Sequence, residues 1–577
     1  MEEIGNILPN TPVVIDGNTT TEFLANPEHY YEKLIDMIGK SNKKVILSAL
    51  YLGTSALELK IIEQLEHSLS RFDDLEVTLI LDYSRAMRKI RNPDGGFSST
   101  LTITDKLIQS YHPRFRIYLY QMPQIHRINK RVDKFNDLWR KLTGFSAGAA
   151  DCATVELEEY NKSHLVPSPI DEALGVYHCK YCLFERDGDE SNGGLERTTI
   201  LTGANLSEEY FSSRQDRYLV CTTPTSCVPT EVDPMAHFLL RFTATVTPHC
   251  YEVFPGGSEA KKTKETKGKN QPGGLSAGPR ILLRLPEVGD KGLLQKDLAT
   301  LTAGAERTAD LISSDSPHIS CHPLVQHHGI GLLEESTFLP RLIGARAAGG
   351  TGGSLWDRIV ITTPYVSFSK AMVTSLVNFI ELRSGTGAST STVSTACPSL
   401  TLSPLEFVLP SLASHGFNSA TGFKATIPQC HALMLGKVLD KLRREGATPG
   451  AETGVSEEGR WSLRWYDRPK WTYHAKGMWF YRRDGGVTAE PVPCATYLGS
   501  SNLGVRSWCR DFELGFLIVP SPGSAATTFG AQLKREVTNI NLHSNEKLPI
   551  ERAYENRNNK FPPAVVRVIA RIIRSYL

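Results

Sequence analysis

The chain lacks the features that would place it in several specialised classes. It has no apolar run approaching the ~20 residues that cross a bilayer, so any membrane role should be peripheral. With 64 Lys and Arg against 62 Asp and Glu, the net charge of +2 gives no sign of the basic excess of nucleic-acid binders. The 11 cysteines are scattered without paired spacing, which favours free thiols in a reducing compartment over a disulfide scaffold.

The first residues show no targeting signal either. The stretch MEEIGNILPN is acidic, and it has neither the apolar core of a signal peptide nor the arginines of a transit peptide. We therefore expect either a cytosolic protein or one whose targeting segment is absent from this chain.

The length and composition indicate a large globular protein. Hydrophobic residues make up 40% of the chain and charged residues 22%, as in ordinary globular proteins. At 577 residues the chain is too long for one ordinary domain, so two domains or two fused halves are expected. A polar stretch rich in Lys and Gly at 256–279 predicts a flexible linker between a first half at 1–255 and a second half at 280–577.

Each half shows the same order of strand-like and helix-like segments. Apolar strand patterns at 43–53 and 357–367 are each followed by a helical pattern. A second buried strand follows in each half, at 75–84 and 405–411. The alternation predicts an α/β fold with a largely buried sheet, and the repeated order predicts an internal duplication.

Two aromatic segments, GVYHCKYCLF at 175–184 and WTYHAKGMWF at 471–480, each contain a His and a Lys two residues apart. Side chains two apart on a strand share a face, so both should point the same way. One His-x-Lys is expected by chance, but here an Asn follows each His by 27 or 28 residues, and an acid follows each Asn by eleven. The sets are His178, Lys180, Asn205 and Asp216, then His474, Lys476, Asn502 and Glu513.

The repeated set suits phosphodiester exchange without a metal or other cofactor. An imidazole can attack phosphorus and form a phosphohistidine if a carboxylate orients its ring, a role open to Asp216 and Glu513. A second imidazole can protonate the leaving oxygen and then deprotonate the incoming nucleophile. Lysine ammoniums and asparagine amides can stabilise the phosphoryl oxygens. We therefore expect the two half-sites to face each other and supply two copies of each group.

These residues resemble the phospholipase D superfamily, in which two H-x-K-x(4)-D repeats form one active site. The segments YLGTSALELKIIEQLE, LTGANLSEEYFSSRQDRY and LGSSNLGVRSWCRDFE look most similar to the eukaryotic mitochondrial CDP-diacylglycerol–glycerol-3-phosphate 3-phosphatidyltransferases. Bacterial phosphatidylserine synthases of the phospholipase D type are near relatives of that branch. The resemblance spans most of the chain and implies two phospholipase D-like α/β halves, related by a pseudo-twofold axis, with one active site at their interface.

The resemblance also implies roles for the repeated residues. We predict His178 as the nucleophile and His474 as the acid and base, with the two Lys and two Asn binding phosphate. The chain departs from the superfamily pattern at the motif acid, seven residues after each His, where it has Glu185 and Tyr481. The first copy also reads TGAN where the second reads GSSN. These departures argue against a strict two-Asp scheme, but the remaining groups are intact, so we expect activity.

Arginines beside the motifs could bind the second phosphate of the substrates, because a guanidinium can hold phosphate through two hydrogen bonds. A structural ion pair is the alternative for each of them. The candidates are Arg217, Arg506 and Arg510, with Arg214 close by in the sequence.

A Cys pair and the C-terminal segment suggest a metal site and a membrane helix, but ordinary structural roles are favoured for both. Cys179 and Cys182 form a C-x-x-C beside His178, but on a strand the two thiols face opposite sides, so no zinc is expected. The C-terminal segment 562–577 predicts a basic amphipathic helix. Such a helix either packs on its own domain or lies on an anionic membrane surface, and we favour packing.

The resemblance implies a transferase that makes phosphatidylglycerophosphate and CMP from CDP-diacylglycerol and glycerol-3-phosphate, on the route to phosphatidylglycerol and cardiolipin. It also implies a peripheral protein at the anionic surface of the mitochondrial inner membrane, on the matrix side, with no nucleic-acid partner. The alternatives are a lipid or nucleic-acid phosphodiesterase that uses water, a phosphatidylserine synthase, and an inactive scaffold. The intact His pair argues against the scaffold. The acceptor separates the transferase from the hydrolase, and residue spacing does not reveal it.

Overall fold

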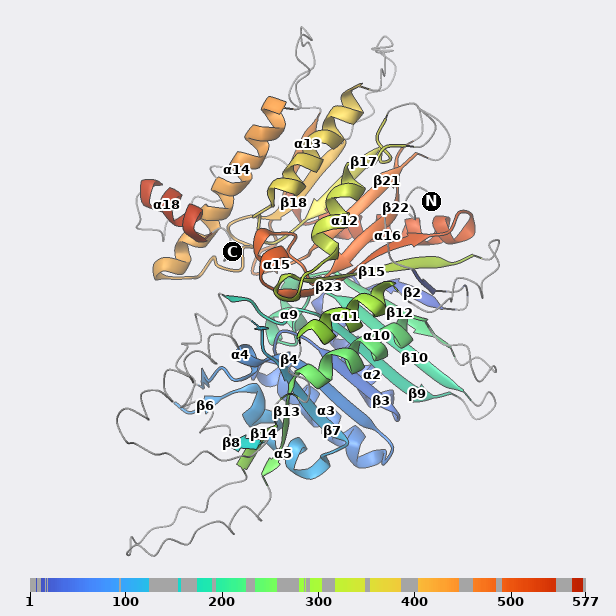
Figure 1. Ribbon diagram of the computed structural model, residues 1–577, viewed down its shortest axis with the longest axis vertical. Helices are drawn as coiled ribbons and strands as arrows, with labels where there is room; N and C mark the ends of the chain where they lie inside the picture. The colour runs from blue at the N-terminus through green and yellow to red at the C-terminus, as the bar shows by residue number, and fades with distance from the viewer. Residues whose placement is uncertain are drawn as a thin grey trace, which may run out of the picture.

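The computed structural model describes most of the chain (Figure 1). The described residues are 7, 12–15, 17, 19–92, 95–123, 154–156, 174–188, 194–224, 234–256, 280–284, 286, 291–303, 317–347, 353–385, 403–445, 460–483, 490–545 and 563–573. The predicted linker lies outside them, apart from Gly256 at the end of a strand.

The first sheet has ten strands, nine of them from the first half of the chain. In order across the sheet they are β2 (Thr20–Phe23), β12 (Tyr218–Thr223), β10 (Leu195–Thr202), β9 (Tyr181–Asp187), β3 (Lys44–Ser48), β4 (Glu76–Asp82), β7 (Phe115–Tyr120), β13 (Tyr251–Gly256), β14 (Arg280–Arg284) and β8 (Thr154–Glu156). The central strands β3, β4 and β7 are parallel, and the other neighbours are antiparallel.

The second sheet is built on the same plan. In order it contains β1 (Val13–Ile15), β15 (Ile319–His327), β23 (Phe512–Pro520), β22 (Val492–Gly499), β21 (Gly477–Arg482), β17 (Arg358–Thr362), β18 (Leu405–Pro410), β19 (Trp461–Tyr466) and β24 (Ser544–Asn545), with β16 (Leu332–Leu333) beside β15. Here β17, β18 and β19 are the parallel strands.

The helices lie beside the two sheets, which sit one above the other in Figure 1. They are α2 (Pro27–Lys40), α3 (Ala56–Arg71), α4 (Tyr83–Ala86), α5 (Thr100–Tyr111), α9 (Glu208–Ser212), α10 (Pro234–Val246), α11 (Lys291–Ala303), α12 (Glu334–Ile343), α13 (Lys370–Gly385), α14 (Ile427–Glu445), α15 (Val505–Cys509), α16 (Ser524–Asn541) and α18 (Pro563–Ile573). Short elements complete the description: β5 (Ile90–Arg91) with β6 (Phe97–Ser98), β11 (Arg214–Gln215) with β20 (Thr472–Tyr473), and the 3-10 turns η1 (Thr247–His249), η4 (His328–Ile330) and η5 (Gly422–Thr426).

The matching strand orders confirm the predicted duplication. The run β12-β10-β9-β3-β4-β7 in the first sheet has the same order and directions as β23-β22-β21-β17-β18-β19 in the second. The helices fall at matching points as well: α3 and α13 follow the first parallel strand, α5 and α14 the second, and α9 and α15 lie between the last two strands of each motif block. The chain therefore forms two α/β halves that are built on one plan.

Local sequence explains why these elements form. Every residue of β17 is buried, as expected for a parallel strand that is covered on both faces. Helix α2 begins after Asn26, whose side chain accepts a hydrogen bond from the amide of His29 at 2.9 Å, and Pro27 fills its first turn. Its Tyr30, Leu34 and Ile38 recur at four-residue spacing and form the buried face.

The two sheets exchange a strand with the opposite half of the chain. Strand β1, near the N-terminus, pairs with β15 of the second sheet. Strand β14, beyond the predicted linker, pairs with β13 of the first sheet. The division of the chain at 256–279 stays a prediction, but the sheets themselves do not divide there.

Aromatic packing and a buried ion pair join the halves. Phe238 and Phe242 of α10 lie 5.8 Å and 6.0 Å, between ring centroids, from Phe516 and Phe512 of β23. Arg217, which is 1% exposed, donates to both carboxylate oxygens of Glu536 on α16 at 2.8 Å. Its guanidinium also donates to the carbonyl of Tyr497 and the hydroxyl of Thr496, and it lies 4.0 Å over the ring of Trp479.

Replacing Arg217 should therefore destabilise the protein strongly. The change Arg217→Ala leaves the Glu536 carboxylate buried without its counter-charge, so we expect the free energy of unfolding to fall by about 3–5 kcal/mol in urea denaturation. The matched control is Arg186→Ala, because Arg186 makes the same two-bond contact with Glu196 on the surface, where the loss should stay below about 1 kcal/mol. Equal losses from the two variants would contradict this assignment.

Candidate functional site

The His-x-Lys segments lie at the junction of the two sheets. They were expected to form strands over their whole length, but β9 begins at Tyr181 and β21 at Gly477, after the His and the Lys in each case. That expectation was wrong at the start of each strand. The physical reason is that the residues before each strand extend across the junction, where they bond to the backbone of the other half.

The backbone contacts across the junction have the same form on both sides. The amide of His178 donates to the carbonyl of Phe512 at 2.8 Å, and the amide of His474 donates to the carbonyl of Gln215 at 2.8 Å. The parallel ladder of β11 and β20 extends the second contact. Each motif is therefore held by the segment that carries the acid of the opposite half.

The side chains of the histidines and acids also pair across the junction, each histidine with the acid of the other half. The Nδ1 atom of His178 lies 2.8 Å from Oε2 of Glu513, and the Nδ1 atom of His474 lies 2.7 Å from Oδ2 of Asp216. All four side chains are less than 10% exposed. The sequence left open which acid serves which imidazole. In the structure each acid serves the imidazole of the other half, and the carboxylate on Nδ1 directs Nε2 of each ring away from that acid.

Both lysines are buried close to their own histidines. Lys180 donates to the carbonyl of His178 at 2.8 Å. Lys476 donates to the carbonyl of His474 at 3.0 Å, and its Nζ lies 3.4 Å from Oδ2 of Asp216. A buried lysine without a full counter-charge is costly, so these ammoniums suit an anionic ligand.

The two asparagines are buried with hydrogen-bonding capacity to spare. Asn205 is 3% exposed and Asn502 is 9% exposed. Within the described part of the chain, the side-chain oxygen of each has no hydrogen-bond partner. Buried amides left in this state are uncommon in native structures, and such groups often mark a ligand site.

The halves differ beside the acids. Ser500 donates a short hydrogen bond to Oε2 of Glu513. Gly203 occupies the corresponding place in the first half, where a Cβ atom would come within 2.7 Å of Oδ1 of Asp216. The difference between TGAN and GSSN in the sequence is therefore a difference in how the two orienting acids are held.

Sequence reasoning did not single out Tyr210. Its hydroxyl lies 3.1 Å from Nε2 of His474, and its ring packs edge-on against the imidazole. Among the described residues, His178 has no such contact at Nε2. The place that corresponds to Tyr210, five residues after the Asn, is held by Ser507, which accepts a hydrogen bond from the amide of Asn502 at 3.1 Å. Comparing the two repeats in the sequence could therefore have drawn attention to Tyr210, because the repeats differ at this position.

Burial and charge set the protonation of the site. Burial lowers the pKa of both His178 and His474 well below the usual value, and the neighbouring lysines lower it further. Burial lowers the pKa of Lys180 to about 7 and that of Lys476 to about 8. At neutral pH the imidazoles are therefore unprotonated in the free protein. A neutral imidazole is the nucleophilic form.

The guanidinium of Arg217 is committed to structural contacts, which do not favour the prediction that it binds substrate phosphate, while its backbone amide donates to Asp216 at 2.9 Å. Four of its N–H groups donate to Glu536, Tyr497 and Thr496. The sequence placed it next to Asp216, and its side chain forms the ion pair that joins the halves.

Two of the other arginines, Arg506 and Arg214, carry charge that acts on the histidines. Arg506 donates to Asp511 at 3.0 Å, and its charge contributes to the lowered pKa of His178. Arg214 donates to Thr472 at 2.9 Å and contributes in the same way at His474. Arg510 ends α15, with its carbonyl against Gly175. Phosphate binding by Arg506 and Arg510 stays a prediction.

The motif-acid positions lie further along the strands. Glu185 is near the end of β9, where its carboxylate accepts a hydrogen bond from Arg197 at 2.8 Å. Tyr481 is in β21, with Arg358 5.3 Å from its ring. Neither makes a side-chain hydrogen bond with the histidines among the described residues.

The described ranges show neither a cluster of metal ligands nor a membrane span. No three His, Cys, Asp or Glu side chains are grouped there as a metal ion would require. Cys179 and Cys182 are buried in different hydrophobic clusters, on opposite faces of the first sheet. In the same ranges, no helix combines the length and apolar character of a bilayer span.

The chain is similar in sequence to curated phosphatidyltransferases. The chain is 24% identical over 554 residues to "CDP-diacylglycerol--glycerol-3-phosphate 3-phosphatidyltransferase, mitochondrial" of Cricetulus griseus, covering 94% of this chain and 80% of the relative. It is 23% identical over 513 residues to a probable enzyme of the same name from Dictyostelium discoideum, covering 86% and 69%. No protein-family model matches the chain.

A solved structure has the same fold. The phosphatidylserine synthase of Haemophilus influenzae matches with a TM-score of 0.57 at 15% identity, over 100% of this chain and 99% of that one. At this identity the match shows the fold alone.

The lowered pKa of Lys180 makes a prediction about stability. Between pH 7 and about 10 the unfolded chain keeps this lysine protonated while the folded protein does not, so its contribution to the free energy of unfolding rises with pH. Relative to that of Lys180→Met, the free energy of unfolding of the wild type should rise by up to about 1.4 kcal/mol per pH unit across this window. Urea denaturation at several pH values measures the difference, and other titrating groups cancel. The exposed Lys60→Met is the control. A constant difference for Lys180→Met would show that Lys180 stays charged when buried.

Proposed function

Because the chain is a homologue of the CDP-diacylglycerol–glycerol-3-phosphate 3-phosphatidyltransferases, with a phospholipase D-like fold, we propose that it catalyses their reaction. It transfers the phosphatidyl group of CDP-diacylglycerol to glycerol-3-phosphate, which releases CMP and forms phosphatidylglycerophosphate. The observation that carries this proposal is the pair of buried, crossed His–carboxylate contacts.

In the first step, Nε2 of His178 attacks the lipid phosphorus. An N–P bond forms, and the bond from phosphorus to the bridging oxygen of CMP breaks. Support for His178 in this role comes from its neutral ring and from the absence, among the described residues, of a hydrogen bond at its Nε2. Glu513 holds the proton on Nδ1, so the lone pair lies on Nε2.

His474 moves the proton. It protonates the leaving oxygen of CMP in the first step and takes the hydroxyl proton of glycerol-3-phosphate in the second. The acceptor oxygen then attacks phosphorus, and the N–P bond breaks to release His178. Burial keeps His474 neutral in the free enzyme, but an anionic substrate beside it favours the imidazolium. The hydrogen bond to Tyr210 keeps its Nε2 in a fixed direction.

The lysines and asparagines stabilise the charge on the phosphoryl oxygens. An anionic substrate favours the charged forms of Lys180 and Lys476, and Asn205 and Asn502 can donate through their side-chain amide N–H groups. Fixed donors in a site that excludes water stabilise developing charge better than water does. No step needs a metal ion.

The names of the relatives and the proposed substrate support a proposal about location. Several of the relatives are named as mitochondrial proteins, and CDP-diacylglycerol is a membrane lipid. We place this protein at the matrix side of the mitochondrial inner membrane, as a peripheral enzyme.

The test is CMP release from CDP-diacylglycerol in detergent micelles, with and without glycerol-3-phosphate, in the presence of EDTA. We expect release that depends on the acceptor and survives EDTA. His178→Ala and His474→Ala should each lower the rate by at least about 10³-fold, because each removes a group that acts in the transition state. Release at full rate without acceptor, with phosphatidic acid as product, would instead identify a hydrolase. No release under any condition would refute the proposal.

The crossed pairing can be tested in the background of His474→Ala, which keeps the nucleophile. In that background, Asp216→Asn should lower the rate of CMP release by less than about threefold, because the ring that Asp216 orients is gone. Glu513→Gln should lower the rate by about the same factor as it does in the wild type, because Glu513 orients His178. The reverse pattern would show that each acid serves the histidine of its own half.

A further inference from the structure

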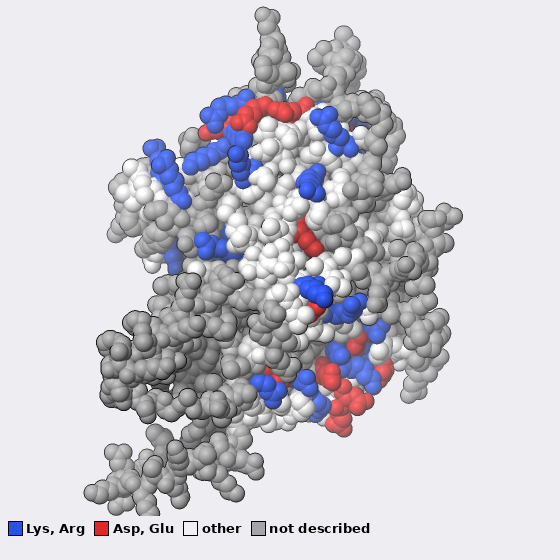
Figure 2. Space-filling model, in the orientation of Figure 1, with Lys and Arg blue, Asp and Glu red and all other residues white. Residues whose placement is uncertain are grey.

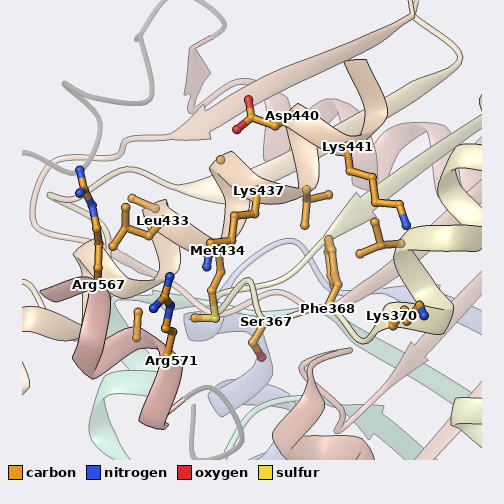
Figure 3. A pocket seen from close by; sticks show the side chains of 15 residues that line it. Ser367, Phe368, Lys370, Leu433, Met434, Lys437, Asp440, Lys441, Arg567 and Arg571 are labelled. Atoms are coloured by element: carbon orange, nitrogen blue, oxygen red, sulfur yellow. The ribbon is translucent and has the colours of Figure 1, made fainter. Parts of the chain in front are cut away.

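A groove of about 630 Å³ lies where α18 packs on α14, next to α13 (Figure 3). It is separate from the histidine pair and within the range of small-molecule sites. Its floor is apolar and well packed: Phe368, Val373, Met434, Val438 and Ala570 are all less than 10% exposed. A ligand in this groove would therefore rest on hydrocarbon.

The rim of the groove is positively charged. Lys370, Lys437, Arg567 and Arg571 line it and are exposed, and none has an ion-pair partner among the described residues. Figure 3 shows Lys437 between the two arginines of α18 and the side of the groove next to α13. In Figure 2, Lys and Arg side chains gather on the part of this face that α14 and α18 occupy.

The acids nearby do not neutralise this rim. Asp440, which also lines the groove, is paired with Arg443 at 3.4 Å. Glu445 is paired with Lys441 at 3.3 Å. The four remaining cations therefore face the groove without a counter-charge among the described residues. An apolar floor under such a rim fits a ligand with a hydrocarbon chain and an anionic head.

Helix α18 adds exposed hydrocarbon beside the charge. The sequence predicted a helix packed on its own domain, and Val566 and Ala570 do pack against Cys430 and Met434 of α14. However, Val565 is 39% exposed and Val568 is 54% exposed. Exposed apolar side chains next to arginines are typical of a helix that lies in a membrane interface.

The inner end of the groove approaches the histidines. The carbonyl of Ser367, which lines the groove, accepts a hydrogen bond from the amide of Val505 at 2.8 Å. Two residues earlier, the ring of Tyr365 lies edge-on to His474, with 6.2 Å between the ring centroids. A surface that binds membrane at this groove would therefore bring the bilayer close to the catalytic pair.

We propose that this groove binds one anionic phospholipid of the membrane and so docks the protein on the bilayer. An acyl chain lies on the apolar floor, and the phosphate lies among Lys437, Arg567 and Arg571. Val565 and Val568 enter the interface beside it. The proposal concerns binding and needs no assumption about the reaction.

The test is flotation with vesicles of phosphatidylcholine alone or of phosphatidylcholine with phosphatidylglycerol, using the full chain. The wild type should bind the anionic vesicles and not the neutral ones. The double variant Lys437→Glu/Arg571→Glu should bind them at least about 25-fold more weakly, since each basic group near an anionic surface contributes about fivefold. Lys437→Gln/Arg571→Gln removes charge without reversing it and should fall between the two.

The matched control is Lys60→Glu/Arg71→Glu, which changes the same two residue types on α3 of the other half, where both are exposed. It should bind like the wild type, and thermal unfolding should be the same for all variants. Equal losses in the control, or equal binding to neutral vesicles, would overturn the proposal.

A second measurement separates a lipid from a free phosphate. In calorimetry, short-chain phosphatidic acid below its micellar concentration should bind the wild type but not the Lys437→Glu/Arg571→Glu variant. Any binding of glycerol-3-phosphate should be equally strong in the two proteins. If only the soluble phosphate binding were lost, the groove would be an anion site and not a lipid site. Flotation requires no catalysis, so an inactive enzyme would count against the transferase and leave this proposal standing.

Discussion

The site depends on the crossing of two buried contacts, His178 with Glu513 and His474 with Asp216. Each half carries a histidine that it does not orient and an acid that its own histidine does not use. Neither half could hold its imidazole alone, so the site exists only when the halves are docked. This explains why the junction carries aromatic packing between α10 and β23 and a fully buried Arg217. A shift of one half against the other would disturb both imidazoles together.

The duplication supplies two of every group, yet the proposed reaction needs two different roles. The structure provides the difference at the points where the repeats diverge. Tyr210 bonds Nε2 of His474, and the matching place in the second half is a serine that bonds backbone instead. Ser500 supports Glu513, while Gly203 leaves room beside Asp216. Small substitutions around an otherwise symmetric frame are enough to make one imidazole open at Nε2 and the other engaged.

Much of the fold was readable from the sequence because its signals are local. Buried strands such as 357–367 and the repeated order of elements depend on hydrophobic pattern, and the structure has β17 and the duplication there. The spacing of His and acid likewise singled out the residues that form the two contacts across the junction. The crossing itself was not readable, because spacing along the chain does not tell which half an acid faces. The partner of Arg217 was not readable for the same reason: its neighbour in sequence is Asp216, but its partner is 319 residues away.

The C-terminal helix α18 has apolar residues on two of its faces. Its pattern predicts one stripe, and a helix that only packed on α14 would need no more than Val566, Ile569 and Ala570. Val565 and Val568 lie outside that contact, next to arginines that have no acid partner among the described residues. Water would favour polar residues at both valine positions. A bilayer surface accounts for both at once, because it takes up hydrocarbon and supplies the missing negative charge at the same depth.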